Sequence, residues 1–389
     1  MSTAVPEESA GVLGDRHDAV TICRAALTVG RQLPHTHRLD GSASGSATAF
    51  SRARRRRRVD APATGRPAPR PAAGLAWHQP GRTVVVLNPT VTNRADREAL
   101  RRVLERHGHR APVFVATTAA DPGGGQAAGA VRDGAALVVV CGGDGTLRAA
   151  ADALAGTGVP LALVPCGTGN LLARNLGLPL GPADALDAAL GGTVHRVDLG
   201  HVEGDGLGSR HFAAMSGAGL DAAMVRWANA HDRLKSRLGW PVYALAVLRE
   251  LRTPRTGVSI RLDGAPALRR TARMVLVGNI GTVQGGVTLL PAARPDDGRL
   301  DLLLLDPRGP GDWLRALWAL LRPGAAAGAA RSASRRPAPV EHFTFRHAEF
   351  TFDTPQPREL DGDPVSPGRR LSVTVRPAAL TMLLPERGK

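Results

Sequence analysis

The residues with the clearest chemical potential lie in a glycine-rich stretch near the middle of the chain. Val138–Val140 are β-branched and apolar, as at the end of a buried strand, and Cys141 then leads into Gly142-Gly143-Asp144-Gly145-Thr146-Leu147. Glycines let the backbone approach a bulky anion because no Cβ stands in the way. The helix start that follows would add unpaired N–H groups and a partial positive charge. Asp144 would repel phosphate unless a cation lay between them. The stretch therefore predicts a nucleotide-phosphate site with a divalent metal, although an ordinary glycine-rich βα turn is the alternative.

Two further strand ends carry small polar residues. Val159–Pro165 is strand-like and leads into Cys166-Gly167-Thr168-Gly169-Asn170, and upstream Thr83–Leu87 leads into Asn88-Pro89-Thr90. The carboxyl ends of parallel strands meet at one edge of a sheet, where such sheets bind nucleotides. The three segments are therefore expected to form one site.

The elements that must hold these residues alternate as β-α-β from residue 82 onward. Strands are expected at 83–88, 111–117 and 137–140, with helices ending at 107–108 and spanning 123–132. This order predicts a Rossmann-like parallel sheet with helices on both sides. From about residue 195 the pattern changes to the apolar–polar alternation of half-exposed antiparallel strands. A second, antiparallel β-sandwich domain is expected, with helices at 219–230 and 238–251, a glycine-rich turn at 217–221, and strands at 257–262, 271–278, 299–305, 342–352 and 370–376.

The two glycine motifs, GGDGT and PCGTGNLLARNLGLP, resemble those of the diacylglycerol kinase catalytic family, which includes sphingosine, ceramide and bacterial lipid kinases. The resemblance covers roughly residues 82–385 and does not identify the lipid. It implies binding of ATP with Mg²⁺. No P-loop and no protein-kinase motif set occurs, so backbone N–H groups, hydroxyls and metal would hold the phosphates. The candidate nucleotide residues are Asn88, Thr90, Thr117, Gly142, Gly143, Asp144, Gly145, Thr146, Leu147, Thr168, Gly169 and Asn170.

The chain departs from the family pattern at several positions. Val91-Thr92 stands where the family usually has Ser-Gly, and Arg148 stands where it commonly has Asn. Arg148 could clamp a phosphate or simply face solvent. Late in the chain, the family's Asp-Gly-Glu becomes Asp361-Gly362-Asp363. The resemblance assigns the third residue, Asp363, as the proton acceptor, with Asp361 as the first alternative and a plain hairpin turn as the structural explanation.

A second metal site is implied by the turn Arg294-Pro295-Asp296-Asp297-Gly298-Arg299. Carboxylate and carbonyl oxygens in such a turn can gather a hard cation. By resemblance this is a structural magnesium site, formed by the Asp297 carboxylate and the carbonyls of Arg294 and Arg299. An ordinary Asp-Asp-Gly turn between strands is the alternative.

Composition limits the partners. The chain has 50 Lys and Arg against 34 Asp and Glu, a net charge of +16, which suggests an anionic partner. The basic run Arg54–Arg58 lies in an N-terminal segment, 1–80, that reads as a disordered tail or a polybasic tether to anionic lipid. With one tyrosine, the chain lacks the aromatics of a nucleic-acid binder. Three cysteines and no long apolar run predict a cytoplasmic protein, peripheral at the inner membrane surface.

These observations together predict a tail at 1–80, an ATP-binding α/β domain at 81–194 and a lipid-binding β-sandwich domain at 195–389, whose last strand returns to the first domain. The predicted activity is transfer of the γ-phosphoryl group of ATP to a lipid hydroxyl, most simply that of diacylglycerol. Sphingosine or another long-chain alcohol is the alternative substrate, and a catalytically weak nucleotide- and lipid-binding regulator is the alternative function. A homodimer is possible. Residues 311–322, with two tryptophans, are expected either at a membrane interface or as a buried helix.

Overall fold

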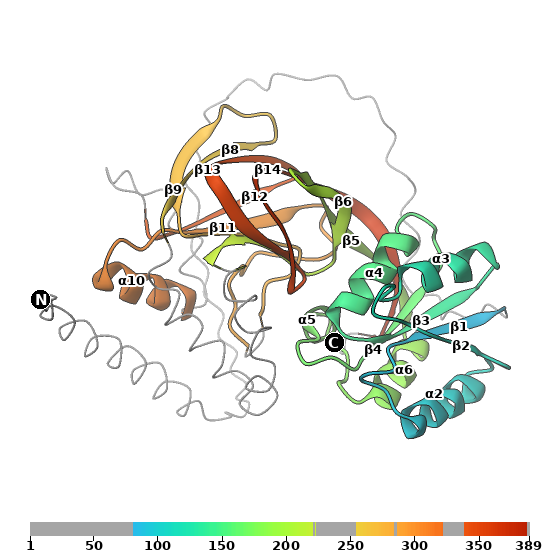
Figure 1. Ribbon diagram of the computed structural model, residues 1–389. Helices are drawn as coiled ribbons and strands as arrows, with labels where there is room; N and C mark the ends of the chain where they lie inside the picture. Colours follow the sequence, from blue (N-terminus) through green and yellow to red (C-terminus); the bar gives the residue numbers. More distant parts are fainter. Residues whose placement is uncertain (1–80, 221, 223–253, 284–285, 322–337, 387–389) are drawn as a thin grey trace, which may run out of the picture. The chain divides into compact units, whose positions relative to one another are not determined.

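The computed structural model describes residues 81–220, 222, 254–283, 286–321 and 338–386 (Figure 1). The predicted tail at 1–80 and the predicted helix at 238–251 lie outside these residues, and so does nearly all of the helix expected at 219–230. Chain contacts group residues 73–389 into one unit.

The first half of this unit is built on four parallel strands. These are β1 (Thr83–Leu87), β2 (Val113–Ala116), β3 (Leu137–Gly142) and β4 (Leu161–Pro165), in the order β2-β1-β3-β4. Every residue of β1, β3 and β4 is buried. Their sequences are near-continuous apolar runs for this reason, since helices cover both faces of such a sheet.

Alternate residues of these strands enter two separate cores. Val84, Val86, Val138 and Val140 pack on one face with α3 (Gly124–Arg132) and α4 (Asp144–Leu154). Val85 and Val139 pack on the other face with α2 (Arg94–Arg106) and α6 (Pro182–Leu190). The period of two along a strand produces this division. The predicted Rossmann-like arrangement is confirmed, and Figure 1 shows these helices around the strands. A short helix, α5 (Leu171–Asn175), follows β4.

The second half is antiparallel, as predicted. The strands are β5 (Thr193–Gly204), β6 (Leu207–Phe212), β7 (Met215–Gly219), β8 (Thr256–Leu262), β9 (Leu268–Ala272), β10 (Met274–Gly278), β11 (Leu300–Leu305), β12 (Val340–Phe345), β13 (His347–Leu360) and β14 (Asp363–Leu384). β7 pairs with β10, β10 with β11, and β11 with β12. β13 pairs with β7, β8 and β14, β8 pairs with β9, and β5 pairs with β6 and β14. A separate core of alternating apolar residues, including Phe212, Phe345, Phe350 and Phe352, fills the sandwich.

The last strand joins the two halves. β14 pairs with β13 and β5 along most of its length, and near its end Met382 pairs in parallel with Leu161 of β4. A residue at the start of β14 and one near its end therefore belong to different parts of the fold. The domain bounds at 80/81 and 194/195 stay a prediction.

Three details differ from the sequence expectation. The strand expected at 271–278 is two strands that meet at Arg273. The first, β9, pairs with β8, whereas the second, β10, pairs with β7 and β11. The strand expected at 342–352 is likewise broken at Arg346, where the Asp263 carboxylate accepts the N–H groups of Arg346 and His347. The glycines at 217–219 lie in the buried strand β7 rather than in a turn.

Helix α10 (Pro310–Leu321) divides its side chains between two environments. Trp313 and Ala316 pack against the core, whereas Leu314 and Trp318 are 49% and 58% exposed. Neither expectation for this segment, a buried helix or an interfacial one, describes it completely. Among the described residues, no helix combines the length and apolar character that crossing a membrane requires.

Candidate active site

The first glycine turn has the geometry expected of an anion-binding helix start. Gly143 is the N-cap residue of α4, which begins at Asp144. A Cβ on Gly142 would lie 2.6 Å from the Cβ of Thr146, so only glycine fits between β3 and the first turn of α4. Thr146 is itself buried. The N–H groups at the start of α4 lack helical partners, as at any helix N-terminus, and are suited to an anion.

Asn170 shapes the second turn. Its side chain holds the peptide of Gly167 at both ends: Oδ1 accepts from the Gly167 N–H at 2.9 Å and Nδ2 donates to the Gly167 carbonyl at 2.7 Å. Asn170 adopts a left-handed conformation with φ 48°, which asparagine tolerates better than most residues. Arg174 adds a hydrogen bond of 2.9 Å from Nε to the Gly169 carbonyl. These side chains give the second turn its shape, and Thr168 lies exposed at its tip.

The two turns touch, and Asp144 links them. A Cβ on Gly167 would lie 2.5 Å from the Cα of Gly143. The Asp144 Oδ1 accepts from the Leu171 N–H at 2.8 Å, so the carboxylate caps the start of α5. Burial raises the pKa of Asp144 above its ordinary value, while backbone N–H groups at the start of α5 favour the charged form. Asp144 thus joins the N-termini of α4 and α5.

The third segment lies at the same edge of the sheet. The Asn88 N–H donates to the Cys141 carbonyl at 2.9 Å, which fixes the end of β1 beside the end of β3. The Asn88 side chain accepts from both the N–H and the hydroxyl of Thr90, at 3.0 and 2.7 Å. Thr117 is buried at the end of β2 and donates its N–H to the Leu87 carbonyl. The three predicted strand ends are therefore neighbours.

Leu147 differs from the other predicted nucleotide residues. Its side chain is 2% exposed and belongs to the core beneath α4. Its N–H donates to the Gly143 carbonyl within the helix. Both groups are used in the fold, so the structure shows a packing role for Leu147, and its predicted place in the nucleotide site stays a prediction.

Asp363 reaches the first turn from far along the chain. It opens β14 directly after a tight turn at Asp361-Gly362, where both residues have positive φ (49° and 86°). A Cβ on Gly145 would lie 3.0 Å from the Asp363 Oδ2, and Arg148 Nη2 donates to the same oxygen at 2.7 Å. The Asp363 side chain remains 45% exposed. A carboxylate accessible to solvent therefore stands at the start of α4.

Asp361, the alternative proton acceptor, is occupied by the fold. Its carboxylate accepts three backbone N–H groups, from Ala213, Ala214 and Met215, at 2.8, 2.8 and 2.9 Å. It is 5% exposed, and burial raises the pKa of Asp361 to about 7 against the effect of those donors. A carboxylate so enclosed anchors the β13–β14 turn to the β6–β7 connection and is not open to a substrate hydroxyl.

Sequence reasoning missed the residues that support this turn. Glu359 Oε2 accepts from the Gly362 N–H at 2.7 Å. Arg358 is 1% exposed and donates to the carbonyls of Ser366, Arg370 and Asp205, which holds the two strands of the hairpin together. The sequence signal for these residues was the charged run Arg358-Glu359-Leu360-Asp361 in an otherwise alternating strand. A hairpin exposed on the surface would have the same composition, so the run does not predict burial.

The predicted magnesium turn is fixed by another missed residue, Asp198. The Asp198 carboxylate accepts from the N–H groups of Gly298 and Ala378 at 2.6 and 2.7 Å, and its own N–H donates to the Pro295 carbonyl. Burial raises the pKa of Asp198. Asp297 Oδ1 accepts from the Arg299 N–H at 3.0 Å. Arg294, Asp297 and Arg299 are exposed on a turn held from inside, and the metal site expected there stays a prediction. No cluster of three or more His, Cys, Asp or Glu side chains suited to a metal occurs among the described residues.

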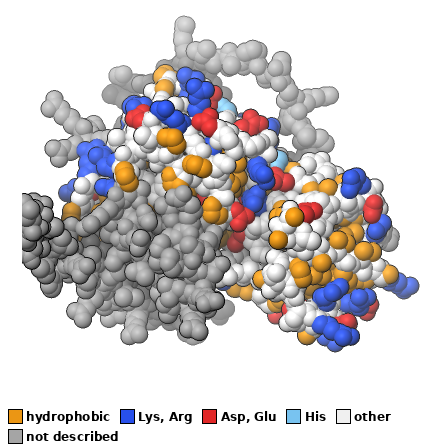
Figure 2. Space-filling model, in the orientation of Figure 1, with side chains coloured by type: hydrophobic (Ala, Val, Ile, Leu, Met, Phe, Trp, Pro, Cys, Tyr) orange, Lys and Arg blue, Asp and Glu red, His pale blue; other side chains and the backbone are white. Residues whose placement is uncertain are grey.

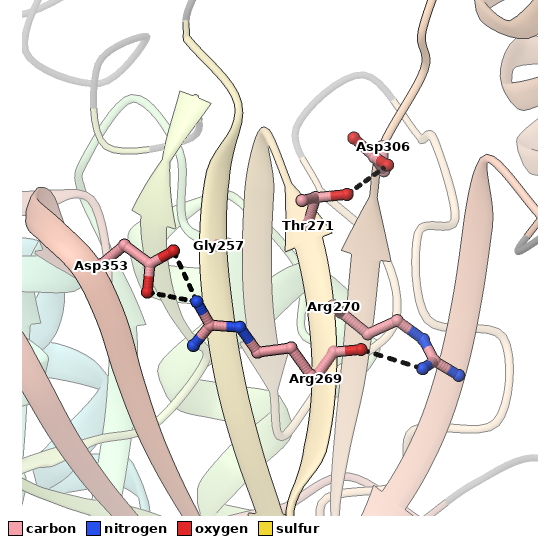
Figure 3. Close-up of a pocket in the computed structure, with 6 residues that line it drawn as sticks. All are labelled: Gly257, Arg269, Arg270, Thr271, Asp306 and Asp353. Atoms are coloured by element: carbon pink, nitrogen blue, oxygen red, sulfur yellow. Dashed lines mark hydrogen bonds and ion pairs between the residues drawn. The ribbon is translucent and has the colours of Figure 1, made fainter.

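A cavity of about 340 Å³ lies elsewhere, in the sandwich (Figure 3). It contains none of the predicted site residues. Its charged groups are paired with one another or with neighbours: Arg269 with Asp353, Arg270 with Glu341, and Asp306 with Arg255 and Thr271. It is lined by Gly257, Arg269, Arg270, Thr271, Asp306 and Asp353. The charged groups of this cavity are therefore used in contacts between strands. The candidate active site is the sheet edge that carries the two glycine turns.

Comparison with known proteins agrees with this geometry. Residues 82–202 match the model of the diacylglycerol kinase catalytic domain, and residues 214–384 match that of the YegS C-terminal NAD kinase beta sandwich-like domain. A diacylglycerol kinase of Mycobacterium tuberculosis H37Rv is 31% identical over 241 residues, which cover 60% of this chain and 76% of that protein. A protein of Pseudomonas aeruginosa PAO1 named "Probable lipid kinase YegS-like" is 36% identical over 260 residues, 66% of this chain and 79% of its own length.

A solved structure extends the likeness to the fold. The crystal structure of a diacylglycerol kinase from Bacillus anthracis superposes with a TM-score of 0.63 at 20% identity, covering 80% of this chain and 99% of that one. This likeness extends over most of the chain and nearly all of that protein. The two family models and the curated relatives show that this chain belongs to the diacylglycerol kinase catalytic family of lipid kinases.

Proposed function

We propose that the protein transfers the γ-phosphoryl group of ATP to the hydroxyl of diacylglycerol, giving phosphatidic acid. The observation that carries the proposal is the position of Asp363. A half-exposed carboxylate from the β13–β14 hairpin lies against Gly145, in the first turn of the helix that begins at the phosphate-binding motif. The names of the relatives favour a lipid as the acceptor.

The roles of the chain's own residues follow from their contacts. The N–H groups at the start of α4 and the hydroxyl of Thr168 would bind the phosphates, with Asn88, Thr90 and Thr117 at the adjoining strand ends. Asn170 and Arg174 keep the second turn in its conformation. Asp363 would accept the proton of the lipid hydroxyl, an effect typically worth 10²–10⁴ in rate.

The proposal includes Mg²⁺ in two places. At the phosphates it would neutralise charge that develops during transfer, and Asp144 would hold it through a water molecule. At the sandwich turn, Asp297 and the carbonyls of Arg294 and Arg299 would hold a structural ion. Asp144 would contribute its negative charge to the first site, and Asp198 fixes the conformation of the turn at the second.

The wider setting is proposed on the same basis. A lipid substrate implies a protein that works at the inner membrane surface from the cytoplasm, and an anionic leaflet suits the net positive charge. In Figure 2 the Lys and Arg side chains on the visible face form several separate groups with acidic side chains among them. The basic run at 54–58 lies outside the described residues. The proposed oligomeric state is a homodimer, which the molar mass in solution would test.

The test is incubation with γ-³²P-ATP, Mg²⁺ and detergent-dispersed lipids, followed by thin-layer chromatography. The panel should contain diacylglycerol, sphingosine, ceramide and a long-chain alcohol. We expect label in phosphatidic acid with the wild type and at least a hundredfold less with Asp363→Asn, with nucleotide affinity unchanged. Label on sphingosine alone would move the proposal to the alternative substrate. Nucleotide binding without label in any lipid would favour a regulator.

A further inference from the structure

Helix α4 contacts three other elements through charged side chains spaced by four residues. Asp144 accepts from the N–H of Leu171 at the start of α5. Arg148 donates to Asp363 on the β13–β14 hairpin. Asp152 accepts from both the N–H and the Nδ1 of His211 on β6, at 2.8 Å each. Residues four apart lie on one face of a helix. One face of α4 therefore joins the two glycine turns to the sandwich.

Arg148 is the central member of this row and is unusually enclosed. The residue is 9% exposed, whereas the Asp363 side chain is 45% exposed. A guanidinium is rarely buried without a compensating carboxylate. Asp363 is the carboxylate that pairs with this guanidinium, whereas the Arg148 Nε has no hydrogen-bond partner among the described residues. Neither the phosphate clamp nor the solvent-facing side chain considered from sequence describes this contact.

We infer that Arg148 is a positioning residue, which fixes the Asp363 carboxylate above the first turn of α4. The inference rests on the proposed function of Asp363. Nη2 of Arg148 donates to the Asp363 Oδ2 at 2.7 Å. The Asp363 Oδ2 and Oδ1 also lie 3.0 and 3.5 Å from the position that a Cβ on Gly145 would take. Arg148 thereby limits the rotation of a short, half-exposed side chain, which otherwise has no rigid neighbour to orient it among the contacts described here.

The physical consequence is a coupling between residues 148 and 363. An aspartate is one methylene shorter than a glutamate, so its reach depends on the direction in which it is held. A positioned base contributes through orientation as well as basicity, and a misplacement of about 1 Å can reduce rates about 10²-fold. Loss of Arg148 should therefore lower kcat without raising the KM for ATP, because Arg148 acts through Asp363.

A double-mutant cycle tests this. Arg148→Gln should lower kcat at least tenfold in the wild-type background and leave it unchanged in the Asp363→Asn background. Arg148→Lys keeps the charge and should recover part of the loss. Arg132→Gln, at an exposed position of α3, is the matched control and should behave as wild type. Additive losses in the cycle, or a rise in the KM for ATP with kcat unchanged, would overturn the inference and make Arg148 a phosphate ligand.

A second readout separates this inference from the proposed function. Urea unfolding should be measured for the wild type, Arg148→Gln, Asp363→Asn and the double variant. If the ion pair forms in solution, the shifts of the unfolding midpoint in the two single variants should not add up to the shift in the double variant. Additive midpoints would mean that the contact is absent and would overturn the inference. Absence of lipid phosphorylation by the wild type, together with non-additive midpoints, would reject the proposed function and leave only a structural ion pair, so that Arg148 would no longer be a positioning residue of a base.

Discussion

Asp361 and Asp363 stand two residues apart in one turn and should respond in opposite ways to the same substitution. Asp361 is enclosed and accepts three backbone N–H groups, two at Oδ1 and one at Oδ2. Asparagine has nearly the same size but only one acceptor oxygen. With that oxygen facing Ala214 and Met215, the amide group would oppose the N–H of Ala213. Asp361→Asn therefore tests whether this carboxylate anchors the hairpin.

The magnitude follows from the donors left without partners. Asp361→Asn would leave the Ala213 N–H and an amide N–H opposed to each other in a buried site. Each unsatisfied buried donor costs about 1–3 kcal/mol. The relief of burying a charge offsets part of this, so we expect a destabilisation of about 2–4 kcal/mol. Asp363→Asn keeps an oxygen for Arg148 at a half-exposed position, so its effect on stability should be smaller than that of Asp361→Asn.

The assay is urea unfolding at pH 8, followed by far-UV circular dichroism and extrapolated to water. The same two proteins should be assayed for lipid phosphorylation under conditions where both are folded. We expect Asp361→Asn to lower stability and Asp363→Asn to lower kcat. If Asp361→Asn unfolds within 0.5 kcal/mol of the wild type, about the scatter of a surface substitution, the anchoring argument is wrong. If Asp361→Asn instead lost kcat while Asp363→Asn did not, the two roles would have to be exchanged.

Three further predictions concern the same region. Burial raises the pKa of Asp361 to about 7, above the ordinary value of about 3.9, so the folded state binds this proton more tightly than the unfolded state does. The free energy by which the wild type is more stable than Asp361→Asn should therefore fall as pH rises from 5 to 8. Paired urea titrations in which this difference grows over the same range would contradict the prediction. Asp144→Asn keeps an acceptor for the Leu171 N–H but removes the charge, so turnover should drop more than tenfold with the fold intact by circular dichroism. If the variant keeps more than a tenth of wild-type kcat, a loss under about 1.4 kcal/mol, Asp144 does not belong to the metal site. Gly167→Ala would bring a Cβ within 2.5 Å of the Gly143 Cα and should weaken ATP binding at least tenfold by calorimetry, whereas Gly208→Ala, with open space around it, should bind as wild type does; equal affinities would show that the two turns need not touch.

Much of the nucleotide half could be predicted from sequence because its signals are local. The apolar runs of β1, β3 and β4 are continuous since both faces of that sheet are covered. Glycines and Asp144 lie where the strands end, and a parallel sheet brings such ends to one edge. The elements therefore follow from residues within a few positions of each other, and the two motifs were enough for the family resemblance.

Side-chain roles within those motifs depended on neighbours that the motifs do not contain. Asn170 matches the requirement for a phosphate donor, yet its amide is used by the peptide of Gly167. Leu147 adjoins the phosphate motif, yet it packs in the core. In both cases the competing partner is set by the turn's conformation, which the residue types alone do not specify.

The sandwich was predicted as a class and less well in detail. Alternation identified antiparallel strands, but the breaks at Arg273 and Arg346 arise where the chain changes its pairing partners. Asp263 accepts the N–H groups at the second break from more than eighty residues away. Period-two patterns do not record a change of partner, because the apolar face continues across it.

The sequence alone determined the chemistry available at the glycine turns, since glycine, carboxylate and helix start are adjacent there. Only the tertiary structure decided which late carboxylate reaches them. Asp361 and Asp363 are equivalent by type and nearly so by position, yet the tight turn between β13 and β14 directs the first into three backbone N–H groups and the second toward Gly145 and Arg148. That choice is made by strand pairing across 215 residues between Arg148 and Asp363, a separation at which local patterns carry no geometric information.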